Sequence, residues 1–504
     1  MPEQNDLIAP RLEKLRRLKE RGINPYPHRF RFTHRIGQIL EEYASAGEEE
    51  GAEMVSVCGR LVAWRDHGKS SFAHIEDATG RLQAYFKLDV VGEEAYAGLK
   101  DLDIGDFVGL HGKMFRTRTK ELTVKVASWE ILGKSLRPMP EKWHGLTDVE
   151  IRYRHRHLDL AANPPAREIF RIRAAAIRAF RDFLDGRGYL EVETPILQSL
   201  YGGAEATPFI TRYESLDMNY FLRISNELYL KRLLVGGLDR VYEFSKDFRN
   251  EGIDRSHSPE FTLLELYQSY ADYGDMMALN EEMMLAIVTA VGPARNRLTG
   301  LDDPPGIITY AGKKLDFTKN WPRVIFSEAL NAKLGFDCLT AADDELRQAA
   351  MRAHIHDHAR LTRPKLLDKL FSELVQAGLD GPVFVVDHPI ELSPLCKSHR
   401  SDPRLAERFE PIIACMEVGN AFSELNDPAE QRRRFESQQE LKRKGDQEAH
   451  ELDESYLEAM ECGMPPAGGL GIGLDRLVML LTNSNSIRDV VLFPQLRPES
   501  NEGA

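Results

Sequence analysis

The sequence predicts an α+β protein in which a five-stranded β-barrel precedes a larger domain of strands and helices. Five short β-rich runs separated by turn signals lie within residues 54–133, which is typical of a barrel of the oligonucleotide-binding (OB) type. Residues 167–188 carry apolar side chains at helical spacing. Two alternating apolar runs then enclose the polar stretch DFRNEGIDRSHSPEF at 247–261, which predicts antiparallel strands in the second domain.

The composition is that of a globular protein in a reducing compartment. Of 504 residues, 42% are hydrophobic and 29% charged, and a chain of this length is expected to form roughly three domains. No apolar run approaches the roughly 20 residues that cross a bilayer, and the N-terminus has no hydrophobic core of an export signal. Five scattered cysteines without CxxC pairs indicate free thiols. We therefore expect a cytoplasmic protein without a membrane segment.

The net charge of −13 bears on nucleic-acid binding. A negative protein does not attract nucleic acid as a whole, so any such binding must use local basic surfaces. One basic segment is residues 7–21, which has the pattern of an amphipathic helix.

Four regions are expected along the chain. They are an N-terminal helical segment at 1–53, the barrel at 54–135, a linker at 136–160, and the second domain at 161–504. The linker contains Pro138 and Pro140. Within the second domain, residues 323–377 are expected to form a mostly helical insertion.

The polar stretch at 247–261 connects two strands whose side chains alternate. Before it, aromatic residues alternate with polar ones that end in Arg249, and after it Phe261, Glu265 and Tyr267 share one face. A hairpin would carry Arg249, Glu265 and Tyr267 onto one surface of a sheet. Because unpaired buried charge is costly, these groups either bind a ligand or form a structural ion-pair network. This stretch alone leaves both interpretations open.

A glycine-rich strand favours the ligand. GGLGIGLDRLVMLL (468–481) places Gly469, Gly471 and Gly473 on one strand face, ahead of a helix that carries Arg476. Glycines of one parity let a flat ligand or a backbone approach closely, and an arginine just beyond suits a polyphosphate.

An acidic strand also favours a bound ligand. RFEPIIACMEVGNAFSELND (408–427) holds Glu410 and Glu417, followed by Asn420, Phe422 and Glu424 on one strand face. A pair of carboxylates near a bound phosphate is what a hard Mg²⁺ ion requires.

Together these stretches resemble the class II aminoacyl-tRNA synthetases, and within that class the bacterial lysyl-tRNA synthetases. The first signature is FLDGRGYLEVETPIL (183–197), the second FRNEGIDRSHSPEF (248–261) and the third GLGIGLDR (469–476). YLKRLLVGG, LYQSYADY, GNAFSELND and SIRDVVLFP narrow the match to the lysine enzymes. The resemblance covers nearly the whole chain.

The resemblance implies a fold, a reaction and partners. The fold is a class II catalytic domain, with an antiparallel sheet flanked by helices, behind an anticodon-binding OB fold. The reaction joins L-lysine and ATP into lysyl-adenylate with release of pyrophosphate, and then transfers lysine to the 3′ end of tRNA(Lys). Similar enzymes are homodimers whose interface is built around the segment that holds Pro195.

The resemblance also implies an ATP site in which Arg249 and Arg476 are catalytic. The Arg249 guanidinium would clamp the α-phosphate and the amino-acid carboxylate, which fixes the attack geometry and stabilises developing charge. Phe261 would stack on adenine, with Arg476 over its opposite face near the γ-phosphate. The other implied contacts are Glu251 to the adenine amino group, His257 to the terminal phosphates, and Glu410 and Glu417 to Mg²⁺.

The lysine pocket implied by the resemblance ends in Glu227, Glu424 and Tyr267, which suit an ε-ammonium group. Such a site rejects analogues that lack the ammonium by roughly 10⁴ or more, because its carboxylates stay buried and unmatched. Taken alone, Glu227 would be interpreted as a helix-surface glutamate. The remaining implied contacts are Gly203 and Glu265 to the α-amino group, Arg249 to the carboxylate, and Asn420 and Phe422 along the walls.

In the barrel, Phe72 and Gln83 match positions that stack on and hydrogen-bond anticodon bases, with Arg65 and Glu121 beside them. Aromatic stacking contributes roughly 1–3 kcal/mol per base, and polar side chains then distinguish base edges. The alternative for Phe72 is an ordinary core aromatic.

The chain departs from the family pattern in the amino-acid region and in one turn. Thr207 stands where the family usually has arginine, and residues 212–214 are Arg-Tyr-Glu instead of His-His-Asn. The turn between Glu410 and Glu417 usually contains paired glycines, whereas this chain has Ala414-Cys415. Both departures leave local geometry open.

HIHDH (354–358) is a separate candidate site. His354 and His358 lie one helical turn apart and could bind a metal, but the stretch lacks the glutamate of HExxH.

Three other functions share parts of this pattern. A synthetase for aspartate or asparagine would need basic residues where Glu227 and Glu424 stand. A paralogue that transfers lysine to a protein lacks the N-terminal barrel. A catalytically inactive RNA-binding protein has no need to retain Arg249, Arg476 and the paired carboxylates.

Overall fold

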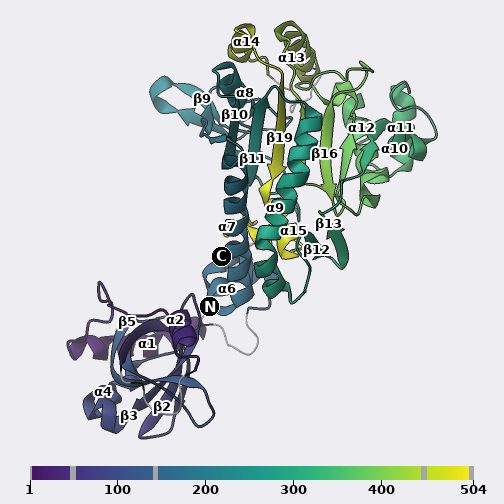
Figure 1. Ribbon diagram of the computed structural model, residues 1–504. Helices are drawn as coiled ribbons and strands as arrows, with labels where there is room; N and C mark the ends of the chain where they lie inside the picture. The colour runs from purple at the N-terminus through teal and green to yellow at the C-terminus, as the bar shows by residue number, and fades with distance from the viewer. Residues whose placement is uncertain (1–2, 46–50, 52, 140–145, 444–450, 499–504) are drawn as a thin grey trace. The chain divides into compact units, whose positions relative to one another are not determined.

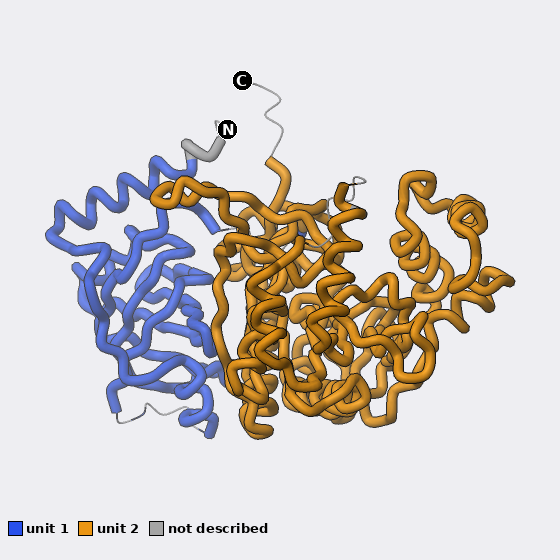
Figure 2. Tube along the Cα trace, turned by 90° about the horizontal axis from the view of Figure 1, so that it is seen from above, with its two compact units in different colours: residues 1–147 blue, residues 148–504 orange. Residues whose placement is uncertain are grey.

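The computed structural model describes residues 3–45, 51, 53–139, 146–443 and 451–498. The chain divides into two compact units, Met1–Thr147 and Asp148–Ala504 (Figure 2). The first contains both the N-terminal segment and the barrel. Of the expected linker, residues 140–145 lie outside the described residues, and the part from Asp148 onward belongs to the second unit. None of the described helices has the length and hydropathy that a membrane span requires.

Unit 1 is a closed five-stranded barrel with strand order β1-β2-β3-β5-β4 (Figure 1). The strands are β1 (Met54–Asp66), β2 (Ser70–Glu76), β3 (Arg81–Lys87), β4 (Phe107–Arg116) and β5 (Leu122–Gly133). Along each strand, apolar side chains that point into the barrel alternate with side chains on its outer face. In β2, Ala73 and Ile75 point into the core, while Phe72 and His74 lie on the outer face and are only partly buried. The predicted five-stranded barrel is confirmed.

Short helices pack on this barrel. They are α1 (Glu3–Glu20), α2 (Ile36–Glu42), α3 (Leu88–Val91), α4 (Glu93–Gly98) and the 3₁₀ turn η1 (Leu99–Asp101). The basic residues of α1 contact acidic residues at the barrel: Lys14 pairs with Asp103 at 2.7 Å and Arg17 with Asp101 at 2.8 Å. The basic helix predicted at 7–21 is therefore partly neutralised by the barrel itself.

Unit 2 is organised around a nine-stranded sheet with the order β14-β15-β16-β18-β19-β11-β10-β6, and β17 pairs with β16 (Figure 1). The strands are β6 (Leu190–Glu191), β10 (Arg240–Phe248), β11 (Glu260–Ser269), β14 (Arg323–Ile325), β15 (Val383–Val386), β16 (Arg408–Ile413), β17 (Met416–Glu417), β18 (Gly419–Ser423) and β19 (Ala467–Gly473). The central pairs are antiparallel, as predicted, but the outer pairs β6·β10 and β14·β15 are parallel. The α+β class is confirmed, with a sheet that is mixed at its edges.

Three helices cover one face of this sheet. They are α7 (Pro164–Asp185), α9 (Tyr273–Thr299) and α15 (Leu474–Thr482). Their apolar side chains share one core with Leu264 and Leu266 of β11 and with Leu470 and Ile472 of β19. Because strand side chains alternate between faces, Glu265, Tyr267, Gly469 and Gly471 must point to the opposite face. That face bears the cavity described below.

The remaining elements surround the sheet. In chain order they are α5 (Val149–Arg154), α6 (Arg156–Ala162), β7 (Leu197–Gln198), β8 (Ile210–Tyr213), η2 (Glu214–Leu216), β9 (Met218–Leu222), α8 (Glu227–Val235), β12 (Ile307–Tyr310), β13 (Lys313–Asp316), α10 (Phe326–Leu334), α11 (Asp343–Arg352), α12 (Arg363–Leu374), η3 (Gln376–Gly378), η4 (Ile390–Leu392), α13 (Pro428–Arg443), α14 (Glu454–Glu461) and α16 (Ile487–Val490). Within the expected insertion at 323–377, α10, α11 and α12 share a core with Val385 of β15 and Ile412 of β16, while β14 is an edge strand of the main sheet.

Candidate active site

A cavity of about 540 Å³ opens on the face of the sheet that α7 and α9 leave uncovered. Gly469, Gly471 and Gly473 of β19 all line it. In the strand register, Gly471 lies opposite Glu265 of β11 on one side and opposite Asn420 of β18 on the other. The floor is therefore bare backbone bordered by polar side chains.

The charged loop connects the two strands of a hairpin, as predicted. β10 pairs with β11 so that Asp247 lies opposite Phe261. Arg249 follows β10, where its backbone N–H donates to the Pro259 carbonyl at 2.9 Å. Its guanidinium carbon lies 5.1 Å from the Phe261 ring centroid, and its buried Nε has no hydrogen-bond partner among the described residues. Arg249 lines the cavity, so its guanidinium can donate to an anion bound there.

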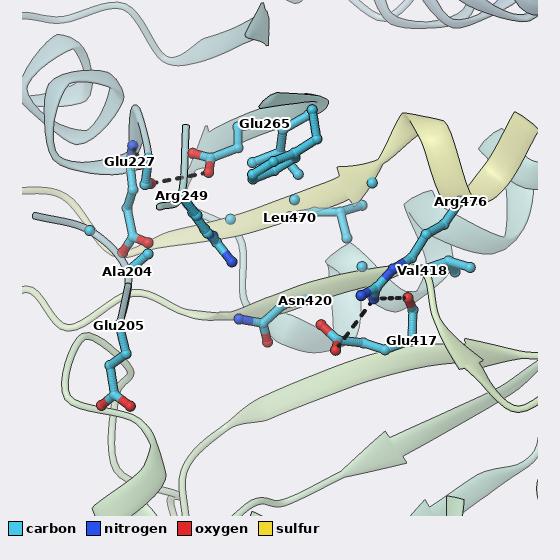
Figure 3. A pocket seen from close by; sticks show the side chains of 18 of the residues that line it. Ala204, Glu205, Glu227, Arg249, Glu265, Glu417, Val418, Asn420, Leu470 and Arg476 are labelled. Carbon is cyan, nitrogen blue, oxygen red and sulfur yellow. Dashed lines mark hydrogen bonds and ion pairs between the residues drawn. The ribbon is translucent and has the colours of Figure 1, made fainter. Parts of the chain in front are cut away.

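A second arginine lies at the other end of the cavity. Arg476 Nη1 donates to the Glu417 carbonyl at 2.6 Å, and Nη2 lies 3.0 Å from Nε2 of His257. Figure 3 shows Arg476 and Glu417 at one end, Glu227 and Glu265 at the other, and Arg249 between them. Arg249 lies beside the Phe261 ring, and the position of Arg476 over the opposite face of adenine stays a prediction. Glu251 also lines the cavity.

Glu417 lines the Arg476 end of the cavity, and Glu410 lies next to it in the sheet without lining the cavity. Ile412 of β16 lies opposite Glu417 of β17, so Glu410 shares a face with Glu417. Burial and the charge on Glu410 raise the pKa of Glu417 to about 7. Mutual repulsion of this kind is relieved by a cation, which fits a divalent ion held partly by phosphate oxygens. Among the described residues no cluster of three or more acidic, histidine or cysteine side chains could hold a metal alone.

Glu410 also has protein partners. Arg408 Nη2 donates to Glu410 Oε1 at 2.7 Å, and His388 Nε2 lies 3.5 Å from Oε2. Although burial opposes it, these two groups lower the pKa of Glu410 to about 2. Arg408 also donates from Nε to Asn420 Oδ1 at 2.9 Å, so it orients a cavity-lining amide. The sequence pattern alone predicted no role for Arg408.

The opposite end of the cavity is acidic. Glu265, 6% exposed, accepts hydrogen bonds from Ser225 Oγ at 3.3 Å and from the Tyr267 hydroxyl at 3.2 Å. Burial, Glu227 and Asp247 raise the pKa of Glu265 well above its usual value. Gly203 borders this end with φ +86°, and a Cβ there would come 2.9 Å from Ser225 Oγ. Only glycine fits that position.

Glu227 and Glu424 are joined by a lysine. Lys231 of α8, fully buried, lies 2.5 Å from Glu227 Oε1 and also pairs with Glu424 Oε2. Glu227 and Phe422 line the cavity, whereas Glu424 and Lys231 lie behind its wall. The predicted acidic end is therefore present, but one basic residue of the protein already contacts it. The sequence analysis missed this pairing although YLKRLLVGG contains Lys231.

The three glycines of β19 differ in what they make room for. A Cβ on Gly469 would overlap Glu424 Oε1 and lie 2.5 Å from Tyr267 Cε1, whereas one on Gly473 would meet only the Val418 carbonyl at 3.7 Å. All three glycines line the cavity, but at Gly469 the groups that approach most closely are protein side chains.

Some residues that depart from the family pattern make local contacts. The Thr207 carbonyl accepts from the Asn250 N–H at 2.8 Å, and Arg212 pairs with Asp217. Ala414 and Cys415 adopt φ of 50° and 63°, so the turn forms despite the missing glycines. His354 and His358 join no metal-binding cluster among the described residues.

The outer face of the barrel gathers the predicted RNA-contacting residues. Phe72 and Tyr85 lie opposite each other in the strand pair, with ring centroids 4.7 Å apart. Gln83 donates to Glu121 at 2.7 Å and accepts from Thr123 at 2.8 Å. Arg65 is exposed and opposite Phe72 in the register. Tyr85 extends this aromatic surface and was missed by the sequence analysis, although alternation in RLQAYF could have placed it there.

Comparisons with known proteins agree with this geometry. Residues 148–497 match the family described as tRNA synthetases class II (D, K and N), and residues 55–132 match the OB-fold nucleic acid binding domain. A lysine–tRNA ligase of Moorella thermoacetica is 51% identical over 498 residues, with 98% of this chain and 99% of the relative covered. Those of Pelotomaculum thermopropionicum (50% over 500 residues, 98% and 95% covered) and Thermotoga maritima (48% over 495 residues, 98% and 96% covered) are similar over comparable lengths.

Proposed function

The chain belongs to the class II tRNA synthetases of the aspartate, lysine and asparagine type, and from that premise we propose that it is a lysine–tRNA ligase. It activates L-lysine with ATP to lysyl-adenylate and pyrophosphate, and then transfers the lysine to the 3′ end of tRNA(Lys). The resemblance drawn from the sequence is confirmed at the level of the family. The observation that carries the choice of lysine is the acidic end of the cavity, opposite an end that holds Arg476.

Activation needs no nucleophile from the protein. The lysine carboxylate attacks the α-phosphorus of ATP, and pyrophosphate leaves. Arg249 lies between the acidic end and the Arg476 end, where its guanidinium can hold the carboxylate and the α-phosphate together. Its donors also stabilise the charge that develops on the phosphorus oxygens. Phe261, under Arg249, supplies a flat surface for adenine, and Glu251 lies within the same cavity.

The terminal phosphates of ATP bind at the Arg476 end of the cavity. Arg476 and His257 approach each other within 3.0 Å and face the terminal phosphates. Glu410 and Glu417 would hold Mg²⁺, which neutralises the phosphates when bound. The raised pKa of Glu417, which burial and the charge on Glu410 cause, supports this assignment because a bound cation would stabilise both ionised carboxylates.

Lysine specificity comes from the acidic end. Glu265 and the Gly203 region receive the α-ammonium, while Glu227, Glu424 and Tyr267 receive the ε-ammonium. Asn420 and Phe422 form the wall between them. An aspartate or asparagine substrate would bring an acidic or neutral side chain to three carboxylates, which is unfavourable.

The barrel reads the anticodon of tRNA(Lys) through its outer face. Phe72 stacks on a base, Gln83 and Glu121 bond its polar edge, and Arg65 contacts the backbone or base nearby. Hydrogen bonds with Thr123 and Glu121 fix the orientation of the Gln83 side-chain amide. Its remaining N–H therefore points in one direction, which supports a role in recognition of an anticodon base.

The chain acts as a cytoplasmic homodimer in this proposal. Leu190, Ile196 and Leu197, around Pro195, are 50%, 44% and 52% exposed. Apolar side chains clustered at a surface favour a protein partner, and a second copy fits the family. Sedimentation at micromolar concentration tests this: a monomer contradicts the interface.

The decisive experiment is ATP–pyrophosphate exchange with each of the twenty amino acids. We expect labelled pyrophosphate to enter ATP only when lysine is supplied. Exchange with another amino acid but not with lysine would overturn the substrate assignment.

A further inference from the structure

Helix α8 buries a cation directly behind the acidic end of the cavity. Lys231 has no exposed side-chain surface, and its Nζ lies 2.5 Å from Glu227 Oε1 and contacts Glu424 Oε2. The same Nζ is 5.1 Å from the Phe422 ring centroid and 6.0 Å from that of Tyr267. Every one of these four partners belongs to the proposed lysine pocket. Lys231 is therefore in contact with the pocket without lining it.

This position is costly for a lysine unless its charge is needed. A buried ammonium loses its hydration, and an apolar side chain of similar size often stabilises such a site equally well or better. Glu227 and Lys231 share one helix face at i,i+4 spacing, which a structural ion pair also satisfies. However, the second carboxylate comes from Glu424, beyond β18, so Lys231 joins two pocket residues from separate elements.

The charges at the acidic end of the cavity give a physical reason for the pairing of Lys231 with two carboxylates. Glu227, Glu265 and Glu424 supply three carboxylates at this end of the cavity, and Lys231 supplies one ammonium. Asp247 and Glu243, the next acidic residues, both pair with the single guanidinium of Arg223, at 3.1 and 2.8 Å, and are left out of this count. Among the three carboxylates and Lys231, two negative charges are left over, and the substrate brings two ammonium groups. These four side chains and the two ammonium groups therefore sum to zero charge when lysine fills the pocket.

Glu424 retains an acceptor for the substrate. Its Oε1 is buried and has no hydrogen-bond partner among the described residues, while Oε2 faces Lys231. A Cβ on the cavity-lining Gly469 would overlap Oε1, so this oxygen lies at the wall of the cavity. Lys231 thus holds one oxygen of the carboxylate, and the other lies directly behind the cavity wall at Gly469.

From this geometry we propose that Lys231 is a positioning residue for the substrate, whose buried ammonium favours the ionised forms of Glu227 and Glu424 and aims them at the ε-ammonium of lysine. The inference rests on the proposed lysine–tRNA ligase function and names a residue that acts through two others. Without Lys231, three carboxylates face two ammonium groups. One carboxylate must then stay unpaired or take up a proton, and the affinity for lysine falls.

The experiment compares wild type, Lys231→Met and Lys134→Met in lysine-dependent ATP–pyrophosphate exchange. Methionine fills the space of lysine without its charge. Lys134 is a matched control because it is also a fully buried lysine, paired with Asp106 at 2.8 Å, but in the barrel. We expect Lys231→Met to raise the KM for lysine by at least about 30-fold, with kcat and the KM for ATP within about threefold of wild type. Lys134→Met should leave both KM values unchanged.

A rescue experiment separates charge from packing. Lys231→Ala leaves a space that matches n-propylammonium, and 1-propanol has the same size without the charge. We expect propylammonium to lower the raised KM for lysine at least about fivefold, and 1-propanol to have no effect. The KM for lysine of the wild type, measured with each additive, shows whether the additive itself competes with lysine for the pocket.

The outcomes are distinct. If wild type shows no lysine-dependent exchange, the proposed function fails, whatever the variants do. If wild type is active, the inference is overturned by a Lys231→Met enzyme whose KM for lysine is within about threefold of wild type, by an equal rise in the KM for ATP, or by rescue with 1-propanol. Should Lys231→Met not fold, Lys231→Ala purified in propylammonium replaces it; recovery of activity supports the inference, and recovery with neither or both additives overturns it.

Discussion

Gly469→Ala is expected to weaken lysine binding while sparing ATP. Gly469 lies between Tyr267 of β11 and Phe422 of β18 in the sheet. An added Cβ would overlap Glu424 Oε1 and come 2.5 Å from Tyr267 Cε1, whereas ordinary van der Waals contact begins at 3.4 Å. Both buried side chains must therefore move by roughly 1 Å.

The size of the effect follows from what those side chains hold. Glu424 is 1% exposed and paired with Lys231, so it has little freedom to relax. Misaligning one charge-assisted hydrogen bond to the ε-ammonium loses about 1.5–3 kcal/mol, which is roughly a 10- to 150-fold loss in kcat/KM for lysine. The KM for ATP should change by less than about threefold, because Gly473 and Arg476 lie at the other end of the cavity.

ATP–pyrophosphate exchange measures both parameters, with lysine varied at saturating ATP and the reverse. Gly381→Ala is the matched control, since its added Cβ meets nothing within 4 Å, and it should leave both KM values unchanged. A Gly469→Ala enzyme with a lysine KM within about threefold of wild type would refute the placement of Glu424 beside the substrate.

The remaining predictions concern the hairpin turn, the barrel and the protonation of the pocket. Replacing Ala414-Cys415 with Asn-Gly should raise the free energy of unfolding by about 1–2 kcal/mol, because both residues now hold a left-handed φ; an unchanged urea midpoint would contradict this. Phe72→Ala should raise the KM for tRNA(Lys) in aminoacylation by about 5- to 150-fold and leave pyrophosphate exchange intact, so equal effects on both reactions would argue against separate sites. Because the pKa of Glu265 is raised by burial and neighbouring acids, the free enzyme holds a proton that the α-ammonium must displace. The KM for lysine should therefore fall by up to about tenfold per pH unit as the pH rises toward that pKa. Glu265→Gln should make the KM for lysine independent of pH over this range. A wild-type KM that does not change with pH would contradict the assignment of this proton to Glu265. The folded state also binds this proton where the unfolded state has lost it, so Glu265 makes the free energy of unfolding decrease as pH rises from 4.5 toward the raised pKa.

Much of this molecule could be predicted from short stretches of sequence. Alternation within ten residues predicted the five barrel strands, the β10–β11 hairpin and the glycine face of β19. Such predictions succeed because the two faces of a strand are determined by neighbouring residues along the chain. The order of three short motifs then identified the family, and with it a cavity that does bring Arg249, Glu265, Tyr267 and Arg476 together.

Only the tertiary structure decided which partner each of these side chains meets. Lys231 was visible in its motif, but Glu424 lies far along the chain, and only the packing of α8 against the sheet brings the two together. Arg408 was equally visible, yet its bonds to Asn420 and Glu410 depend on how β16 pairs with β18. At Gly469 the groups that approach the bare backbone are the side chains of Glu424 and Tyr267. The periodicity of the sequence determines the face of the strand on which a residue lies. The atoms that its side chain contacts come from elements distant in sequence, and the packing of the whole domain determines which of them come close.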